Sequence, residues 1–207
     1  MEYREYKEYI QREFQYITKD NILFWNLWNI SYPFDVLATY KEAYPEEYTL
    51  FSEMYFSCWE MLYQVDEKRE VLVSIFEQTY PFVIDEQGEI INPKNILQQK
   101  YESYDDEILP ELCILLLIGR FDAIYKGIKQ KAERYGERAI NAPMEVISYI
   151  IASYKWGYLF DNMDKSIVRD EVNAQMKLVK KLQTPRLFSL EDRNIFRNKQ
   201  YFIKANC

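Results

Sequence analysis

A chain of 207 residues, of which 48% are hydrophobic and 17% aromatic, carries enough apolar side chains to fold around a core, and this excludes an intrinsically disordered protein. The absence of histidine excludes serine triads, cysteine–histidine pairs and histidine-ligated zinc sites, and the five scattered glycines exclude a phosphate-binding loop. The net charge of −7 divides unevenly, because residues 1–110 hold 22 acidic and 9 basic residues whereas residues 111–207 hold 11 and 17.

Helical spacing of apolar residues runs through the first 80 residues. Tyr32-Pro33 and Pro45 are expected to end helices, because the residue before a proline disfavours the helical conformation. Asp66 offers a cap for the helix that follows it. We predict helices over residues 3–17, 22–32, 34–44, 46–64 and 66–80.

Strand-like residues are confined to about 82–91, where two apolar trios flank a glycine-bearing turn and predict at most one small β-hairpin. A short helix is expected over 92–101. The most apolar stretch of the chain follows, and we predict that about residues 106–118 form a central helix, with acids before its first turn and Gly119 as its end. A helix that is apolar on nearly every side is expected to be surrounded by other helices.

A second apolar stripe lies beyond Gly119 and predicts a helix over residues 121–135, which would form an αα-hairpin with the central helix. The stretch from Ser189 to Asp192 is a capping-box pattern, and it predicts a final helix that contains Ile195 and Phe196. Between these two segments we expect helices over residues 141–158 and 167–181.

These elements predict an all-α fold, a single-domain multi-helix bundle over residues 1–207 around the central helix. Its acidic half covers about residues 1–104 and its more basic half about residues 105–207. The beginning of the chain, Met1 to Glu5, lacks the basic and then apolar run of a signal peptide, which favours a cytoplasmic protein without a membrane partner. Three cysteines without paired spacing disfavour a disulfide framework.

Carboxylates are the remaining candidates for catalysis. Asp105 and Asp106 precede an apolar helix, and Asn162, Ser166 and Asp170 keep a four-residue spacing that would align them on one helical face. Together they resemble the two magnesium-binding motifs of terpene cyclases, and this resemblance implies a magnesium-dependent helical enzyme as an alternative function. Helix capping explains Asp105 and Asp106 more simply, so we expect no metal and no cofactor.

Acidic residues before the central helix carry a second resemblance. Tyr104-Asp105-Asp106-Glu107, leading into Ile114–Arg120, resemble the acidic helical immunity proteins of bacterial toxin–immunity pairs. This resemblance implies a non-catalytic inhibitor that neutralises a cognate toxin by direct contact. Acidic side chains would then steer a basic toxin domain toward the chain, and aromatic side chains would anchor it. The candidate partner-binding residues are Glu42, Tyr44, Glu46, Glu47, Tyr48, Glu53, Trp59 and Glu60.

The basic second half suggests a third function, that of a regulator or adaptor that contacts nucleic acid. Its densest basic group is Lys126, Lys129, Lys131, Arg134 and Arg138, which would meet phosphates or an acidic partner. A solvated helix face explains this group more simply, and no groove-reading motif accompanies it. We therefore expect a protein partner and rank nucleic acid below it.

Overall fold

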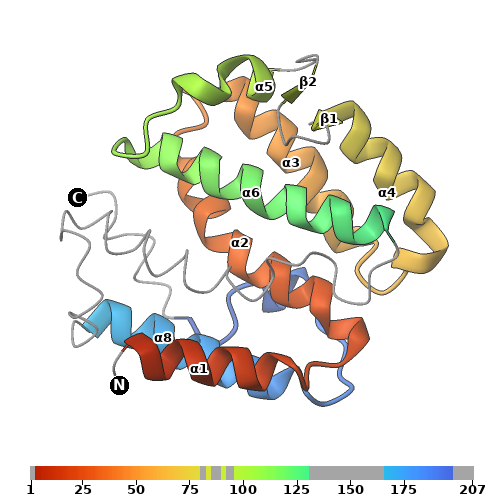
Figure 1. Cartoon of the computed structure of the whole chain (residues 1–207), viewed down its shortest axis with the longest axis vertical. Helices are drawn as coiled ribbons and strands as arrows, with labels where there is room; N and C mark the ends of the chain where they lie inside the picture. Colours follow the sequence, from red (N-terminus) through yellow and green to blue (C-terminus); the bar gives the residue numbers. More distant parts are fainter. Residues whose placement is uncertain (1–2, 80–82, 85–89, 92–95, 131–165, 198–207) are drawn as a thin grey trace.

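The computed structural model describes residues 3–79, 83–84, 90–91, 96–130 and 166–197 (Figure 1). The α-helices are α1 (Tyr3–Phe14), α2 (Ile22–Thr39), α3 (Pro45–Glu60), α4 (Val65–Thr79), α5 (Ile96–Lys100), α6 (Leu109–Lys129) and α8 (Ser166–Lys181). Among the described residues there are also three short 3-10 helices, η1 (Lys19–Asn21), η2 (Tyr101–Ser103) and η5 (Leu190–Asp192). The strands β1 (Val83–Ile84) and β2 (Ile90–Ile91) pair antiparallel, with Val83 opposite Ile91.

The predicted all-α class and the small hairpin are therefore confirmed. The helix predicted over 141–158 lies outside the described residues. Within the described part of the chain, no helix combines the length and the apolar character that a membrane crossing requires.

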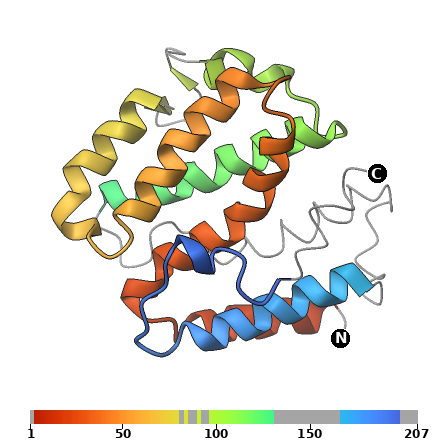
Figure 2. The same cartoon turned by 180° about the vertical axis from the view of Figure 1, so that it is seen from behind.

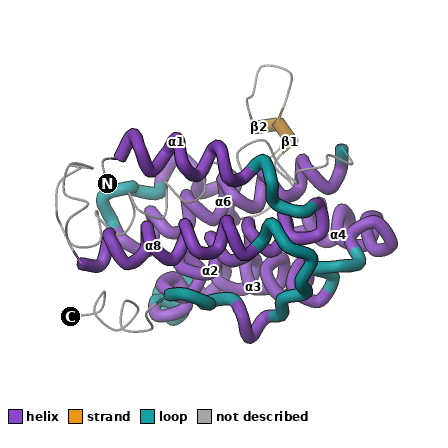
Figure 3. Tube along the Cα trace, turned by 90° about the horizontal axis from the view of Figure 1, so that it is seen from below, coloured by secondary structure: helices purple, strands orange, loops and turns teal. Residues whose placement is uncertain are grey.

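Helix α2 is the element around which the described chain packs, because 15 of its 18 residues are buried. Helices α1 and α8 lie side by side (Figures 1 and 3). Helix α2 contacts α3 and α6. Helix α6, the predicted central helix, also packs against α3 and α4 and buries 11 of its 21 residues. The central position thus belongs to α2 together with α6.

The predicted break at Tyr32-Pro33 is wrong, because α2 continues through Pro33 to Thr39. A proline inside a helix costs roughly 3 kcal/mol, since it removes one amide donor and crowds the preceding turn. Each large apolar side chain that becomes buried returns about 1.5–3 kcal/mol. Trp28 and Phe34, on either side of the proline, are both buried, so burial outweighs the local penalty. Figure 2 shows that α2 bends along its length, as expected of a helix with an internal proline.

The predicted helix end at Gly119 is also wrong, and so is the αα-hairpin built on it. Helix α6 starts at Leu109 and runs without interruption to Lys129. Glycine inside a helix costs only about 1 kcal/mol relative to alanine, which is too little to end a helix whose apolar face continues. Phe121, Ile124 and Ile128 extend that buried face beyond the glycine.

Replacing Gly119 by alanine is expected to stabilise the protein by about 0.5–1 kcal/mol, because alanine restricts the unfolded chain and favours the helix. A Cβ atom built at Gly119 meets no atom within 4 Å, so the added methyl group fits without displacing a neighbour. Urea unfolding of the Gly119→Ala variant and the wild type measures the difference. A loss of stability would show that the glycine is needed for close packing.

The segment that follows α8 packs against the first half of α2. Phe188 stacks on Phe24 with ring centroids 4.4 Å apart, and the Trp28 Nε1 donates a hydrogen bond to the carbonyl oxygen of Ile195 at 3.0 Å. The predicted capping box is present, with Ser189 and Asp192 as its partners. The helix predicted after it is absent from the described residues, where η5 is followed by turns and Phe196 has a positive φ of 71°.

A buried ionic and polar network joins this segment to the helices. The Arg197 guanidinium donates to Glu171 of α8, with Nε 3.0 Å from Oε2 and Nη2 2.8 Å from Oε1. Its Nη1 donates to the Trp28 carbonyl oxygen at 2.7 Å, and its Cζ lies 3.4 Å from the centroid of the Trp28 ring. Gln175 donates to Glu171 and accepts from the hydroxyl of Tyr6 on α1. The network therefore connects α1, α2, α8 and the chain at residue 197.

A second polar contact fixes α1 to α8. The buried Glu13 carboxylate accepts hydrogen bonds from the Lys180 ammonium, from the Gln183 amide at 3.0 Å and from Arg12 at 3.2 Å. The Lys180 ammonium contributes most, followed by the Gln183 amide, and together these donors lower the pKa of Glu13 to about 2. The carboxylate therefore stays ionised in the folded chain under mildly acidic conditions.

The lowered pKa of Glu13 makes the free energy of unfolding depend on pH. Because the folded pKa is about 2 and the ordinary value is 4.5, its stabilising contribution is present above about pH 4.5 and is lost as the pH falls toward 2. The Glu13→Gln variant is expected to be less stable than the wild type at pH 7 and to approach it near pH 2. Urea unfolding at both values tests this, with Glu8→Gln as an exposed control; a constant difference at both pH values would contradict it.

Candidate functional site

The predicted partner-binding residues do not share one surface. Glu42, Glu46, Glu53 and Glu60 are exposed, and Tyr44 and Tyr48 are half-buried. Glu47 and Trp59 are buried, at 1% and 7% exposure, so neither side chain is presented to a partner. Glu60 lies at the far end of α3, about 20 Å along the helix axis from Glu46. The part of the predicted set that lies together is Glu42, Tyr44, Glu46, Glu47 and Tyr48.

This part of the set gains acidic neighbours from a distant stretch of sequence. Residues 41–47, which lead into α3, lie beside residues 100–111, which lead from α5 into α6 (Figures 1 and 2). We call these two segments the acidic end. Together they hold eight acidic and two basic residues, a net charge of −6. The structure thus brings the acid-rich run Tyr104–Glu107 beside residues predicted to bind a partner.

Tyrosine–carboxylate hydrogen bonds join the two segments. Glu111, in the first turn of α6, accepts from the Tyr44 hydroxyl at 2.8 Å and from the backbone amide of Asp105 at 2.6 Å. The buried Glu47 accepts from the Tyr104 hydroxyl at 3.0 Å and from the Lys100 ammonium at 2.9 Å. These four contacts hold the acidic end in one geometry before any partner arrives.

Both tyrosine hydroxyls remain protonated donors. Burial, followed by the hydrogen bond to Glu111, raises the pKa of Tyr44 to about 12. Burial and then the negative charge of Glu47 raise the pKa of Tyr104 well above its ordinary value. A neutral phenol beside a carboxylate serves as a hydrogen-bond donor and not as a base, so these tyrosines position the acids and do not suggest proton-transfer chemistry.

Five acidic side chains of the acidic end point to solvent without an ion-pair partner among the described residues: Glu42, Glu46, Glu102, Asp106 and Glu107. Two apolar side chains are exposed in the same segments, Tyr101 at 39% and Ile108 at 44%. Concentrated negative charge attracts cations over a Debye length of about 10 Å, and exposed apolar side chains supply contact area. This combination suits the recognition of a basic protein surface.

The alternative metal residues are separated by the fold. Asp105 is engaged locally, because its side chain accepts a hydrogen bond from the amide of Glu107 at 2.8 Å. Ser166 and Asp170 lie on α8, a different part of the bundle, and Asn162 lies outside the described residues. Among the described residues, no group of three or more cysteine, aspartate or glutamate side chains is placed to hold a metal ion. The magnesium-dependent enzyme therefore gains no supporting geometry from the described residues.

The predicted basic group is described only in part. Lys126 pairs with Asp122 at 2.9 Å and Lys129 pairs with Glu77 at 3.0 Å, so their charges are partly neutralised within the bundle. The other three members, Lys131, Arg134 and Arg138, lie outside the described residues. Cys58 and Cys113 are fully buried, and burial raises the pKa of the Cys58 thiol to about 12, which suppresses the thiolate.

Sequence reasoning did not place Glu102, Asp106 and Glu107 together with the candidate partner-binding residues. Their signal was present as an acid-rich run before an apolar helix, but helix capping explains such a run more simply. Only the tertiary contact between residues 41–47 and 100–111 makes them part of one surface.

Comparison of the chain with protein-family models, with curated proteins and with solved structures finds no match.

Proposed function

We propose that this chain is a protein-binding protein that recognises a basic partner through the acidic end. We further propose that its biological role is that of an immunity protein, a non-catalytic inhibitor that neutralises a bacterial toxin by direct contact. The observation that carries the proposal is the meeting of residues 41–47 with 100–111, which concentrates five exposed acidic side chains on one end of the bundle.

The internal hydrogen bonds of the acidic end support tight binding. Tyr44 and Tyr104 fix the loops that carry the exposed acids, so little conformational entropy is lost when a partner docks. The exposed Tyr101 and Ile108 supply apolar contact beside the charges. Charge alone sets the rate and direction of approach, whereas buried apolar contacts lengthen the lifetime of the complex.

The proteins encoded by the genes beside this one are the partners to test. Each is co-expressed with the tagged full chain, and each is also expressed alone in a growth assay. We expect one basic protein to copurify in a one-to-one complex and to arrest growth only when this chain is absent. Failure of every neighbouring product to bind, or rescue of growth without a physical complex, would overturn the proposal.

A further inference from the structure

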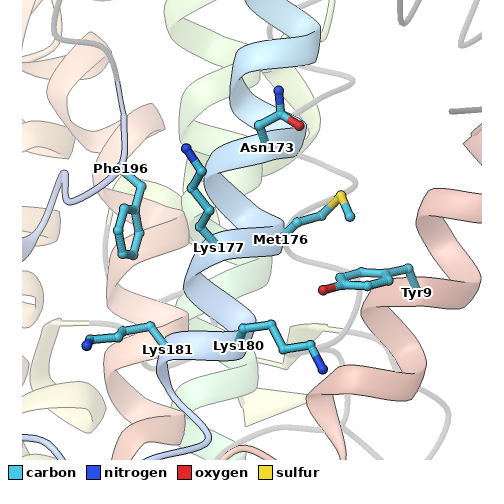
Figure 4. A pocket seen from close by; sticks show the side chains of 7 residues that line it. All are labelled: Tyr9, Asn173, Met176, Lys177, Lys180, Lys181 and Phe196. Carbon is cyan, nitrogen blue, oxygen red and sulfur yellow. The ribbon is translucent and has the colours of Figure 1, made fainter.

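A groove of about 610 Å³ lies along the exposed face of α8, with Tyr9 of α1 at one edge (Figure 4). Figure 4 shows Tyr9 of α1 on one side of α8, where Met176 and Lys180 also point, and Phe196 on the other side, together with the remaining lysines. The three lysines are Lys177, Lys180 and Lys181. The groove therefore combines apolar walls with positive charge.

Two of the three lysines in the groove have no acidic partner among the described residues. Lys180 is paired with the buried Glu13. Lys177 and Lys181 have no ion-pair partner among the described residues, although acids outnumber bases in the whole sequence by 33 to 26. An acidic protein that leaves two lysines unpaired beside exposed apolar surface presents a local site for an anion with an apolar part.

Phe196, the aromatic side chain at one edge of the groove, has an unfavourable backbone conformation. Phe196 has a φ of 71°, in the left-handed region that costs energy for a residue with a side chain, and its ring is 41% exposed. Its two neighbours are anchored, since the carbonyl of Ile195 accepts a hydrogen bond from Trp28 and Arg197 is bound in the buried network. Backbone strain that the surroundings enforce is found most often where a side chain is positioned for binding.

The spacing of the lysines matches an extended peptide. Lys177 and Lys181 are four residues apart on α8, which separates them by about 6 Å along the helix axis. Side chains at alternate positions of an extended chain lie on one face about 6.6 Å apart. The groove follows α8 from Asn173 to Lys181, about 12 Å, which is the length of about four extended residues.

We propose that this groove binds an extended acidic segment of a protein partner. Acidic side chains at alternate positions meet Lys177 and Lys181, and an apolar side chain on the same face lies against Phe196, which shares their side of α8. The site is separate from the acidic end, so it does not depend on the proposed immunity role. A nucleic acid strand is the less suitable polyanion, because the protein's net charge of −7 repels a long row of phosphates more strongly than a short acidic peptide.

Fluorescence anisotropy of a labelled peptide Glu-Ser-Glu-Ser-Phe-Ser, titrated with the full chain at 50 mM salt, tests the proposal. We expect saturable binding that weakens at least tenfold for the peptide in which lysine replaces both acids. Lys177→Glu and Lys181→Glu should each weaken binding about tenfold, as expected when an attractive ion pair becomes a repulsive one. The matched control is Lys68→Glu on α4, an exposed lysine with the same charge change, which should leave binding unchanged.

The Phe196→Gly variant separates binding from folding. Glycine adopts a positive φ without strain, and this gain offsets the greater freedom of the unfolded chain, so the variant should be about as stable as the wild type in urea while binding the peptide several-fold more weakly. Absence of saturable peptide binding, equal effects of Lys177→Glu and Lys68→Glu, or tighter lysine-dependent binding of a labelled oligothymidine of ten nucleotides would each overturn the proposal.

Discussion

The Arg197→Met variant is expected to lose about 3–5 kcal/mol of unfolding free energy, because removing one partner of a buried ion pair leaves the other charge buried and uncompensated. Both side chains of the Arg197–Glu171 pair are fully buried. The guanidinium also donates to the carbonyl oxygen of Trp28 and stacks on its ring, so its removal loosens the segment that covers α2. Chemical denaturation measured by circular dichroism gives the difference directly.

Two further variants identify the cause of that loss. Arg4→Met breaks an ion pair with Glu8 that lies in solvent, and it should leave the unfolding midpoint unchanged. Replacing both Arg197 and Glu171 by methionine should recover part of the stability lost in Arg197→Met, because no charge is then buried without a partner. An Arg197→Met variant as stable as Arg4→Met would show that the buried network does not hold the segment that follows α8 against α2.

The second large effect is expected at Phe34, the residue after the internal proline of α2. Its ring is 2% exposed and stacks on Tyr55 of α3, with centroids 4.1 Å apart. Truncation of a buried phenylalanine to alanine costs about 3–5 kcal/mol, since it removes apolar contact and leaves a cavity. Phe34→Ala is therefore expected to lower the unfolding free energy by that amount in urea denaturation.

Phe56 provides the matched control, since its ring packs edge-on against Phe34 at 5.9 Å but is 39% exposed. Phe56→Ala should cost about 1 kcal/mol, the typical contribution of an aromatic pair at a partly exposed position. Equal losses for the two variants would mean that the junction between α2 and α3 does not depend on burial of Phe34.

Local signals predicted the helices well wherever tertiary packing agreed with them. Helix α3 begins at Pro45, one residue before the predicted start of the helix over 46–64, because proline in the first turn removes an amide that has no partner within the helix. Pro33 and Gly119 are the same kinds of signal, yet neither ends its helix. Burial of the residues on both sides exceeds a local penalty of about 1–3 kcal/mol, and burial depends on contacts that one stretch of sequence does not contain.

The candidate site shows the same division between local and tertiary information. Glu42 and Glu46 were predicted to bind a partner and are exposed, because the segment around them is polar. Glu47 is also polar but is buried, since Tyr104 and Lys100 supply donors from another part of the chain. A carboxylate that finds such partners is removed from the surface, and only the three-dimensional structure shows which ones do.

Association kinetics of the full chain with the captured basic partner test the central claim, recognition through the acidic end, most directly. The claim predicts that the association rate falls steeply as salt rises, and that Glu46→Lys combined with Asp106→Lys lowers it at least tenfold at low salt. Glu67→Lys combined with Glu70→Lys, the same charge change on the exposed surface of α4, should have a much smaller effect. Equal effects of the two pairs, or an association rate independent of salt, would contradict recognition through the acidic end.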